Sequence, residues 1–173
     1  CFTFLLTMSG APFLYYGDEI GMRYLEDVTS VEGGYDRTGS RSPMQWKTGA
    51  GMGFTTADTS YIPFDGSADA PTVEAQEQDG DSLLNAVKTL LRLRGAHPAL
   101  QSFGAFEPVF AQKNAYPFAY RRQGGGEEIL VVLNPADREE RAEFDCGGEV
   151  LFAVGGIVKN GKVPARSACI IKR

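Results

Sequence analysis

Histidine, tryptophan and cysteine are scarce in this sequence, and their scarcity excludes several kinds of site. Its 173 residues include one His, one Trp and three Cys. Because His97 is the sole imidazole, and Cys1, Cys146 and Cys169 show no metal-binding spacing, we predict no metal site and no cofactor. An odd number of cysteines favours free thiols in a reducing compartment, and so a cytoplasmic protein, over a disulfide framework.

Long apolar runs and basic runs are also absent. The longest apolar run, residues 1–8, is too short to cross a membrane and has no basic segment before it, which argues against a signal peptide. No run of five basic residues occurs, and 22 acidic against 17 basic side chains give a net charge of −5. We therefore expect neither nucleic acid nor a membrane as a partner. Because residues 1–8 are apolar on nearly every side, we expect neighbours to cover them, as in a piece of a longer protein.

The first part of the chain has the pattern of a helix end, a strand, a long loop and a helix. Residues 13–16 form a short, unbroken apolar run, which is typical of a strand buried in a parallel sheet. Residues 20–80 show no sustained periodicity, and an ordered loop of that length is usually functional. The apolar stripe of a helix follows over residues 83–93, with Asp81-Ser82 as its cap. This is little more than one βα unit.

The second part differs in charge and in pattern. Residues 1–99 carry 7 basic and 13 acidic side chains, whereas residues 100–173 carry 10 and 9. After residue 100 we predict short strands, separated by breaks rich in Gly, Asn and Pro, among them a two-residue hairpin turn at Asn160-Gly161. They fall near residues 116–120, 129–133, 142–146 (Ala142, Phe144 and Cys146), 150–154 and 167–171. This spacing favours a small antiparallel sandwich of about six to eight strands, so the predicted class of the whole chain is α+β.

Two positions in the first part are candidate ligand contacts. Asp18 and Glu19 directly follow the predicted strand, where open sheets and barrels place ligand sites, although loop carboxylates are often simply solvated. Glycoside chemistry needs two carboxyl groups about 5–9 Å apart that face each other, so these neighbours are expected to bind hydroxyl groups rather than to break a bond. On spacing alone, Arg41 either packs on the Trp46 indole or contacts a ligand.

Three sequence motifs carry a family resemblance. Residues 10–22 (GAPFLYYGDEIGM), 40–46 (SRSPMQW) and, more moderately, 81–85 (DSLLN) resemble the α-amylase superfamily of glycoside hydrolases. The match is best to its oligo-1,6-glucosidase, α-glucosidase and trehalose-synthase-like branch. The resemblance covers about residues 1–100. Residues 101–173 match only as the β-sandwich domain that such enzymes carry after the barrel.

The resemblance implies that residues 1–100 are the C-terminal end of a catalytic (β/α)8 barrel, with residues 13–16 as the eighth strand. It implies that Arg41, Asp18 and Glu19 bind substrate, with Arg41 reaching the glucose before the scissile bond. The family's nucleophilic Asp, acid/base Glu and His-Asp pair follow the fourth, fifth and seventh strands. This chain holds none of those strands, so we assign it no catalytic residue.

We therefore interpret the chain as part of a retaining α-glycosidase that acts on α-glucosides or short oligosaccharides, and we expect it to be inactive alone. A trehalose-synthase-like transglycosylase or isomerase is an alternative. So is a non-catalytic carbohydrate-binding or structural module, and a second polypeptide could supply the missing barrel. We also expect self-association through the truncated barrel edge, where Phe4, Leu5, Phe13 and Leu14 would otherwise face water.

Overall fold

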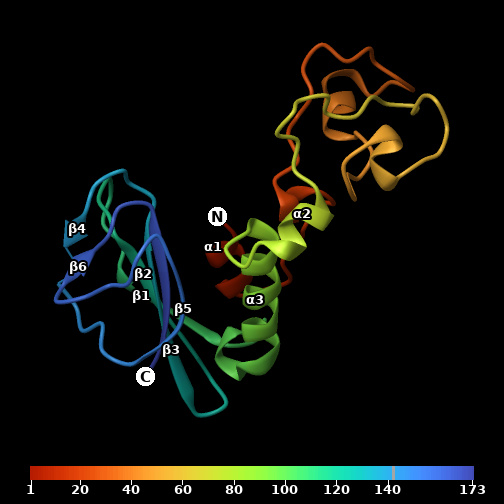
Figure 1. The fold of residues 1–173 in the computed structure, drawn as a ribbon. Coiled ribbons are helices and arrows are strands. Elements are labelled where there is room, and N and C mark those ends of the chain that lie inside the picture. The colour runs from red at the N-terminus through yellow and green to blue at the C-terminus, as the bar shows by residue number, and fades with distance from the viewer. Residues whose placement is uncertain (142) are drawn as a thin grey trace. The chain divides into compact units, whose positions relative to one another are not determined.

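The computed structural model describes residues 1–141 and 143–173. They form two compact units, one made of Cys1–Pro12 with Thr89–Arg173 and the other of Phe13–Lys88 (Figure 1). The first unit combines helical segments with an antiparallel sheet, and the second consists mainly of loop. The predicted α+β class is confirmed.

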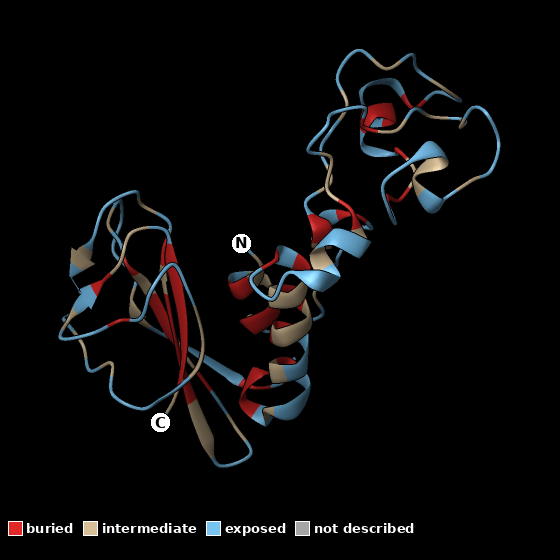
Figure 2. Ribbon diagram, viewed as in Figure 1, coloured by how far each residue is buried: buried red, intermediate tan, exposed pale blue. Residues whose placement is uncertain are grey.

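An antiparallel sheet of five strands forms the core of the first unit. Its strands are β1 (Ala105–Phe110), β2 (Phe118–Gly124), β3 (Glu127–Asn134), β5 (Glu149–Val154) and β7 (Ser167–Lys172), in the order β1-β2-β3-β7-β5. The short strands β4 (Glu140–Arg141) and β6 (Lys162–Val163) pair separately. Figure 2 shows that buried residues gather on the central strands of the sheet. The unbroken apolar run of β3 explains this, because a central strand is covered on both faces.

One apolar cluster joins the five-stranded sheet to the β4–β6 pair. Leu130, Val132 and Ile171 of the sheet pack with Val158 and with Val163 of β6. All five side chains are buried. The two sets of strands therefore share one core.

The strand predicted over residues 142–146 is wrong where the structure describes it. Phe144 and Cys146 lie in no strand, although both side chains pack against the core, and Ala142 lies outside the described residues. The Gly147 N–H donates to Asp145 Oδ1 at 2.8 Å. Such a side-chain acceptor competes with the strand ladder for the backbone and bends the chain.

One short turn and the start of one helix agree better with the sequence. The Lys159 and Lys162 backbone groups exchange hydrogen bonds of 3.1 and 3.0 Å around Asn160 and Gly161. Both turn residues have positive φ, as a two-residue hairpin of this kind requires. The helix α3 (Leu83–Ala96) begins where predicted, because Ser82 Oγ accepts from the Asn85 N–H at 3.2 Å.

Two buried arginines tie helix α1 (Phe2–Thr7) to the rest of the first unit. Arg94 of α3 donates to the carbonyl oxygens of Leu6, Met8 and Gly10 at 2.6–2.9 Å. Arg122 of β2 donates to the Gln101, Gly104 and Ala105 carbonyls at 2.7–3.1 Å and also to the Thr7 carbonyl. The last carbonyls of a helix lack partners within the helix, and cations at this end are favoured by its dipole. The two guanidinium groups therefore complete the end of α1.

In the second unit, residues 13–16 do not form the predicted strand. They form no helix or strand and are exposed, and Phe13 is 89% accessible. A strand exists only where a neighbouring strand supplies hydrogen bonds. Within the described residues no strand lies beside this segment. The run is apolar as the sequence indicates, but the predicted strand pairing and burial are wrong.

Short helical turns and one small core organise the rest of the second unit. Ile20, Met44 and Leu84 are buried together. Its helical segments are the beginning of α3, residues 83–88, the helix α2 (Val73–Gln78) and short 3₁₀ turns at Asp18–Ile20, Tyr35–Ser40 and Ala50–Gly53. The sequence pattern did not predict α2, whose six residues are too few to show a periodicity. It is capped by Thr72 Oγ1, which accepts from the Ala75 N–H at 3.3 Å.

Candidate functional site

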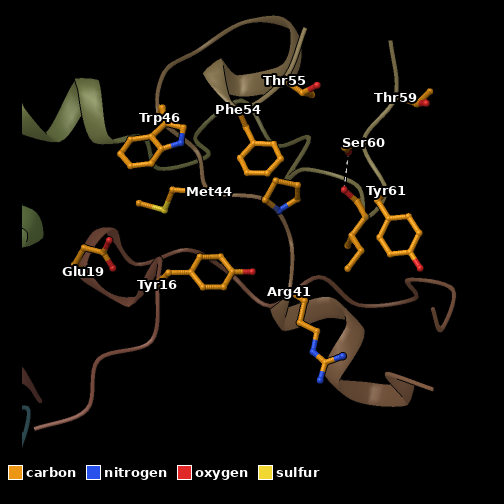
Figure 3. A pocket seen from close by; sticks show the side chains of 12 residues that line it. Tyr16, Glu19, Arg41, Met44, Trp46, Phe54, Thr55, Thr59, Ser60 and Tyr61 are labelled. Atoms are coloured by element: carbon orange, nitrogen blue, oxygen red, sulfur yellow. Dashed lines mark hydrogen bonds between the residues drawn. The ribbon is translucent and has the colours of Figure 1, made fainter. Parts of the chain in front are cut away.

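A cavity of about 500 Å³ lies within the second unit, a volume typical of small-molecule sites. Figure 3 shows the side chains that line it. The charged members are Glu19 and Arg41, and four others are aromatic. The full lining comprises Tyr16, Glu19, Arg41, Pro43, Met44, Trp46, Phe54, Thr55, Thr59, Ser60, Tyr61 and Ile62. The cavity is therefore largely apolar, with a few polar groups.

Asp18 and Glu19 are neighbours in the sequence, but only one of the two carboxylates lines the cavity. Both begin a 3₁₀ turn after Gly17, whose φ of 91° favours glycine. Glu19 lines the cavity, and its Oε2 accepts from the Gly17 N–H at 2.8 Å. Asp18 is exposed and lies outside the lining, where Oδ2 accepts from the Tyr15 N–H at 3.2 Å. The geometry thus brings Glu19, and not Asp18, to the same cavity as Arg41.

Arg41 reaches the cavity from the end of the turn Tyr35–Ser40. Its side chain is exposed, and within residues 1–141 and 143–173 no hydrogen bond or ion pair engages its guanidinium. Gly34 makes room beside it, because a Cβ there would clash with Thr38 Oγ1 and lie 3.4 Å from Arg41 Nη1. Five N–H donors on a rigid planar group are therefore available to a ligand.

Tyr16 stands between these two charged residues in Figure 3. Its hydroxyl donates to the Ser42 carbonyl at 3.1 Å. Partial burial raises the pKa of Tyr16, and Tyr15 adds to the shift, while the positive charge of Arg41 acts in the opposite direction. The phenol therefore stays protonated at neutral pH and remains a hydrogen-bond donor.

Phe54 and Tyr61 also belong to the lining, but neither was predicted from the sequence as a ligand contact. Trp46, Phe54 and Tyr61 are 49%, 55% and 68% exposed. The glycine-rich stretch 49–53, which follows Trp46, is the local sequence feature that indicates a tight turn here. In the structure several of its residues have positive φ angles. Residues 46, 54 and 61 are separated in the sequence, so only the folded loop shows that all three line one cavity.

Other candidate groups lie away from this cavity. His97 Nδ1 is 2.9 Å from Glu127 Oε2, in the first unit, where the pair joins the end of α3 to β3. The three cysteines are free thiols. Among the residues that the structure describes, no cluster of three or more His, Cys, Asp or Glu side chains could hold a metal ion. None of the described helices is long and apolar enough to span a membrane.

Comparison with known proteins identifies the family. The model of the alpha-amylase catalytic domain matches residues 1–102. The chain belongs to the alpha-amylase family. This confirms the resemblance seen in the motifs around Asp18 and Arg41.

Two relatives in the family are enzymes by name. The trehalose synthase/amylase TreS of Mycobacterium tuberculosis is 39% identical over 150 residues, which cover 82% of this chain and 24% of that protein. The oligo-1,6-glucosidase of Parageobacillus thermoglucosidasius is 29% identical over 164 residues, covering 79% of this chain and 29% of that protein. The chain thus spans about a quarter of the length of these family members.

A solved structure confirms the fold. The trehalulose synthase MutB from Pseudomonas mesoacidophila superposes with a TM-score of 0.81 at 24% sequence identity. The match covers 99% of this chain and 37% of MutB. Both parts of the alpha-amylase family chain, loop-rich and sheet-forming, therefore have counterparts in one solved protein.

Proposed function

We propose that this chain forms part of the sugar site of an alpha-amylase-family enzyme that acts on α-glucosides or short oligosaccharides. The observation that carries the proposal is the cavity shared by Arg41 and Glu19, two residues far apart in the sequence. A guanidinium offers several fixed donors to sugar hydroxyl groups, and a carboxylate accepts from them. The names of the related enzymes support this assignment.

Within this site we assign the substrate contacts to Arg41, Glu19 and Asp18. Arg41 and Glu19 would contact the sugar from the cavity lining. Asp18 would act from the rim, because it lies outside the lining and is free to meet a part of the ligand that extends beyond the cavity. We expect Arg41 to contribute most, since its donors have no partner in the described residues.

We further propose that the chain alone does not catalyse hydrolysis. Retaining glycosidases need a nucleophile and an acid/base whose carboxyl groups lie about 5–5.5 Å apart across the bond. Glu19 is the sole carboxylate among the described residues of the cavity lining. The remainder of a (β/α)8 barrel would supply both groups, and the complete protein would be a retaining α-glycosidase or a trehalose-synthase-like transglycosylase.

The same proposal covers the organisation of the chain. Residues 1–100 would be the C-terminal end of the catalytic barrel and residues 101–173 a C-terminal β-sandwich, supported by the core that the sheet shares with β6. The free thiols support a reducing, cytoplasmic compartment. The exposure of Phe13 supports self-association of the 173-residue chain through this apolar segment.

The single Trp of the chain allows a direct test, because Trp46 lines the cavity. We expect methyl α-glucoside to change the Trp46 fluorescence in a saturable way. Arg41→Ala and Arg41→Lys should both weaken binding, since Lys keeps the charge but loses the planar set of donors. Asp18→Asn should have the smaller effect and Glu19→Gln the larger. Binding that is unchanged in both Arg41 variants would contradict the proposal.

A further inference from the structure

The turn that carries Glu19 lies between two glycines. Gly17 and Gly21, on either side of Asp18–Ile20, have φ angles of 91° and 69°. The N–H groups of Gly21 and Met22 donate to carbonyl oxygens at 3.0 and 2.9 Å, and both of these bonds lie within residues 17–22. Glycine leaves the backbone more freedom than any other residue does. The direction in which Glu19 points therefore depends on what anchors the turn from outside.

The turn is anchored at Ile20. The Ile20 side chain is buried with Met44 and Leu84, and its carbonyl oxygen accepts a hydrogen bond from Gln76 Nε2 at 2.7 Å. Apolar burial is not directional, whereas a hydrogen bond fixes the orientation of the group that accepts it. Because Ile20 directly follows Glu19, the Gln76 amide fixes the backbone next to the carboxylate.

The side chain of Gln76 is fixed at its other atom as well. Its Oε1 accepts from the N–H of Leu84, the second residue of α3, at 2.9 Å. The N–H groups in the first turn of a helix have no partner within the helix. A side-chain amide suits this place, because one group supplies both the donor for Ile20 and the acceptor for Leu84.

Helix α2, which carries Gln76, is also bonded to the segment that carries Trp46. The N–H groups of the first two residues of α2 donate to the carbonyl oxygens of Gln45 and Trp46 at 3.0 and 2.9 Å. Trp46 and Glu19 both line the cavity, whereas Gln76 lies outside the lining. The helix thus connects two parts of the cavity lining from behind.

We propose that Gln76 is a positioning residue for Glu19. Its amide fixes the turn Asp18–Ile20 to α2 and α3, so that the Glu19 carboxylate stays in the same cavity lining as Arg41. This inference rests on the proposed function, which gives Glu19 a ligand to contact. It adds a residue that controls sugar affinity through Glu19 and touches no sugar itself.

The variant Gln76→Glu separates the two hydrogen bonds of this side chain. An ionised carboxylate still accepts from the Leu84 N–H, but it cannot donate to the Ile20 carbonyl. Gln76→Met removes both bonds and keeps an unbranched side chain. Gln78→Glu is the matched control, since it makes the same change of charge in the same helix at an exposed position.

Amide hydrogen exchange of the 173-residue chain measures the anchoring without any sugar. In Gln76→Glu we expect the Gly21 and Met22 amides to exchange about two- to tenfold faster, as the loss of one hydrogen bond predicts, and the Leu84 amide to keep its rate. In Gln76→Met all three amides should exchange faster. In Gln78→Glu all three should keep their rates.

Sugar binding then tests whether Gln76 acts through Glu19. Methyl α-glucoside, followed by Trp46 fluorescence, should bind about two- to tenfold more weakly to Gln76→Glu and unchanged to Gln78→Glu. The double variant Glu19→Gln/Gln76→Glu should bind no more weakly than Glu19→Gln alone. Two residues that act through one contact are not additive, which is what this comparison detects.

Three results would overturn the inference. Unchanged exchange at Gly21 and Met22 in Gln76→Glu would mean that the turn needs no such anchor. Equal acceleration at Leu84 in that variant would mean that Gln76 supports both helices as a whole. Additive losses in the double variant would mean that it acts apart from Glu19. Absence of sugar binding by the unaltered chain would contradict the proposed function, and with it the role of Glu19, whereas the exchange comparison decides on the anchor alone.

Discussion

The buried guanidinium of Arg122 offers the clearest test of how the first unit is held together. Replacement by Met keeps much of the apolar stem but removes every donor. Four carbonyl oxygens, of Thr7, Gln101, Gly104 and Ala105, would each lose a hydrogen bond from a charged group. Breaking so many buried contacts at once is among the few mechanisms that give a large loss of stability.

The magnitude follows from the number of acceptors. An unsatisfied buried polar group costs about 1–3 kcal/mol, and carbonyl oxygens tolerate the loss of one partner better than N–H groups do. At about 1 kcal/mol each, four carbonyls lose about 4 kcal/mol. A buried charge is costly to desolvate, and the same burial lowers the pKa of Arg122, so removal of the charge offsets part of this loss. We expect a net loss of about 3 kcal/mol, a large share of the roughly 5–15 kcal/mol that stabilises a domain.

Arg121→Met is the matched control, because Arg121 is the preceding residue of the same strand. Its side chain is 32% exposed, and its ion pairs with Glu107 and Glu128 are both 3.8 Å long. Such pairs contribute about 0–1 kcal/mol. Stability is measured by urea denaturation, with amide hydrogen exchange in β3 as the probe. Trp46 fluorescence is unsuitable because Trp46 reports on the other unit. Equal stability losses in the two variants would refute the assignment of Arg122 as the buried connection between α1 and the sheet.

Two further predictions concern carboxylates. Asp65 pairs with Arg23 at 2.7 Å and is buried, whereas Asp69, which pairs with the same guanidinium at 2.9 Å, is 80% exposed. We expect Asp65→Asn to speed proteolysis between residues 24 and 64 severalfold and Asp69→Asn to have less effect. Equal rates in the two variants would contradict this. Burial acts to raise the pKa of Glu127, but hydrogen bonds from His97, the Ala99 N–H and Lys172 lower it overall. Stability from Glu127 is therefore present above its unfolded pKa, about 4.3, and is lost as the pH falls through its lower folded value. Glu127→Gln should lower the free energy of unfolding by about 1–2 kcal/mol at pH 7 and make it less dependent on pH in the acid range. Urea midpoints at several pH values measure both effects. An unchanged pH profile would contradict the prediction.

The sequence predicted those elements whose signals are local. The start of α3 could be predicted because Ser82 is a strong N-cap followed by an apolar stripe, and the turn at Asn160-Gly161 because few other residue pairs adopt two positive φ angles. The family could be recognised because the motifs around Asp18 and Arg41 are specific. These features depend on residues within a few positions of one another.

Features that depend on distant partners could not be predicted. Residues 13–16 have the apolar character of a buried strand, but pairing needs a neighbouring strand that the described residues do not provide. Arg122 lies two residues after the buried Tyr120 in β2, but charged side chains are seldom buried, and only its contacts with the end of α1 and the neighbouring carbonyl groups explain why it is. Likewise, Glu19 differs from Asp18 only because the fold of the loop brings Glu19 into the same cavity lining as Arg41.

The most direct test of the central claim is to map where a sugar binds. Amide and side-chain NMR shifts of the isotopically labelled chain, titrated with isomaltose, report on every part of the molecule at once. We predict shifts centred on Glu19, Arg41, Trp46 and Phe54, including the Arg41 Nε–H and Trp46 Nε1–H signals. Shifts confined to strands β1–β7 would contradict the account and would make the chain a carbohydrate-binding module.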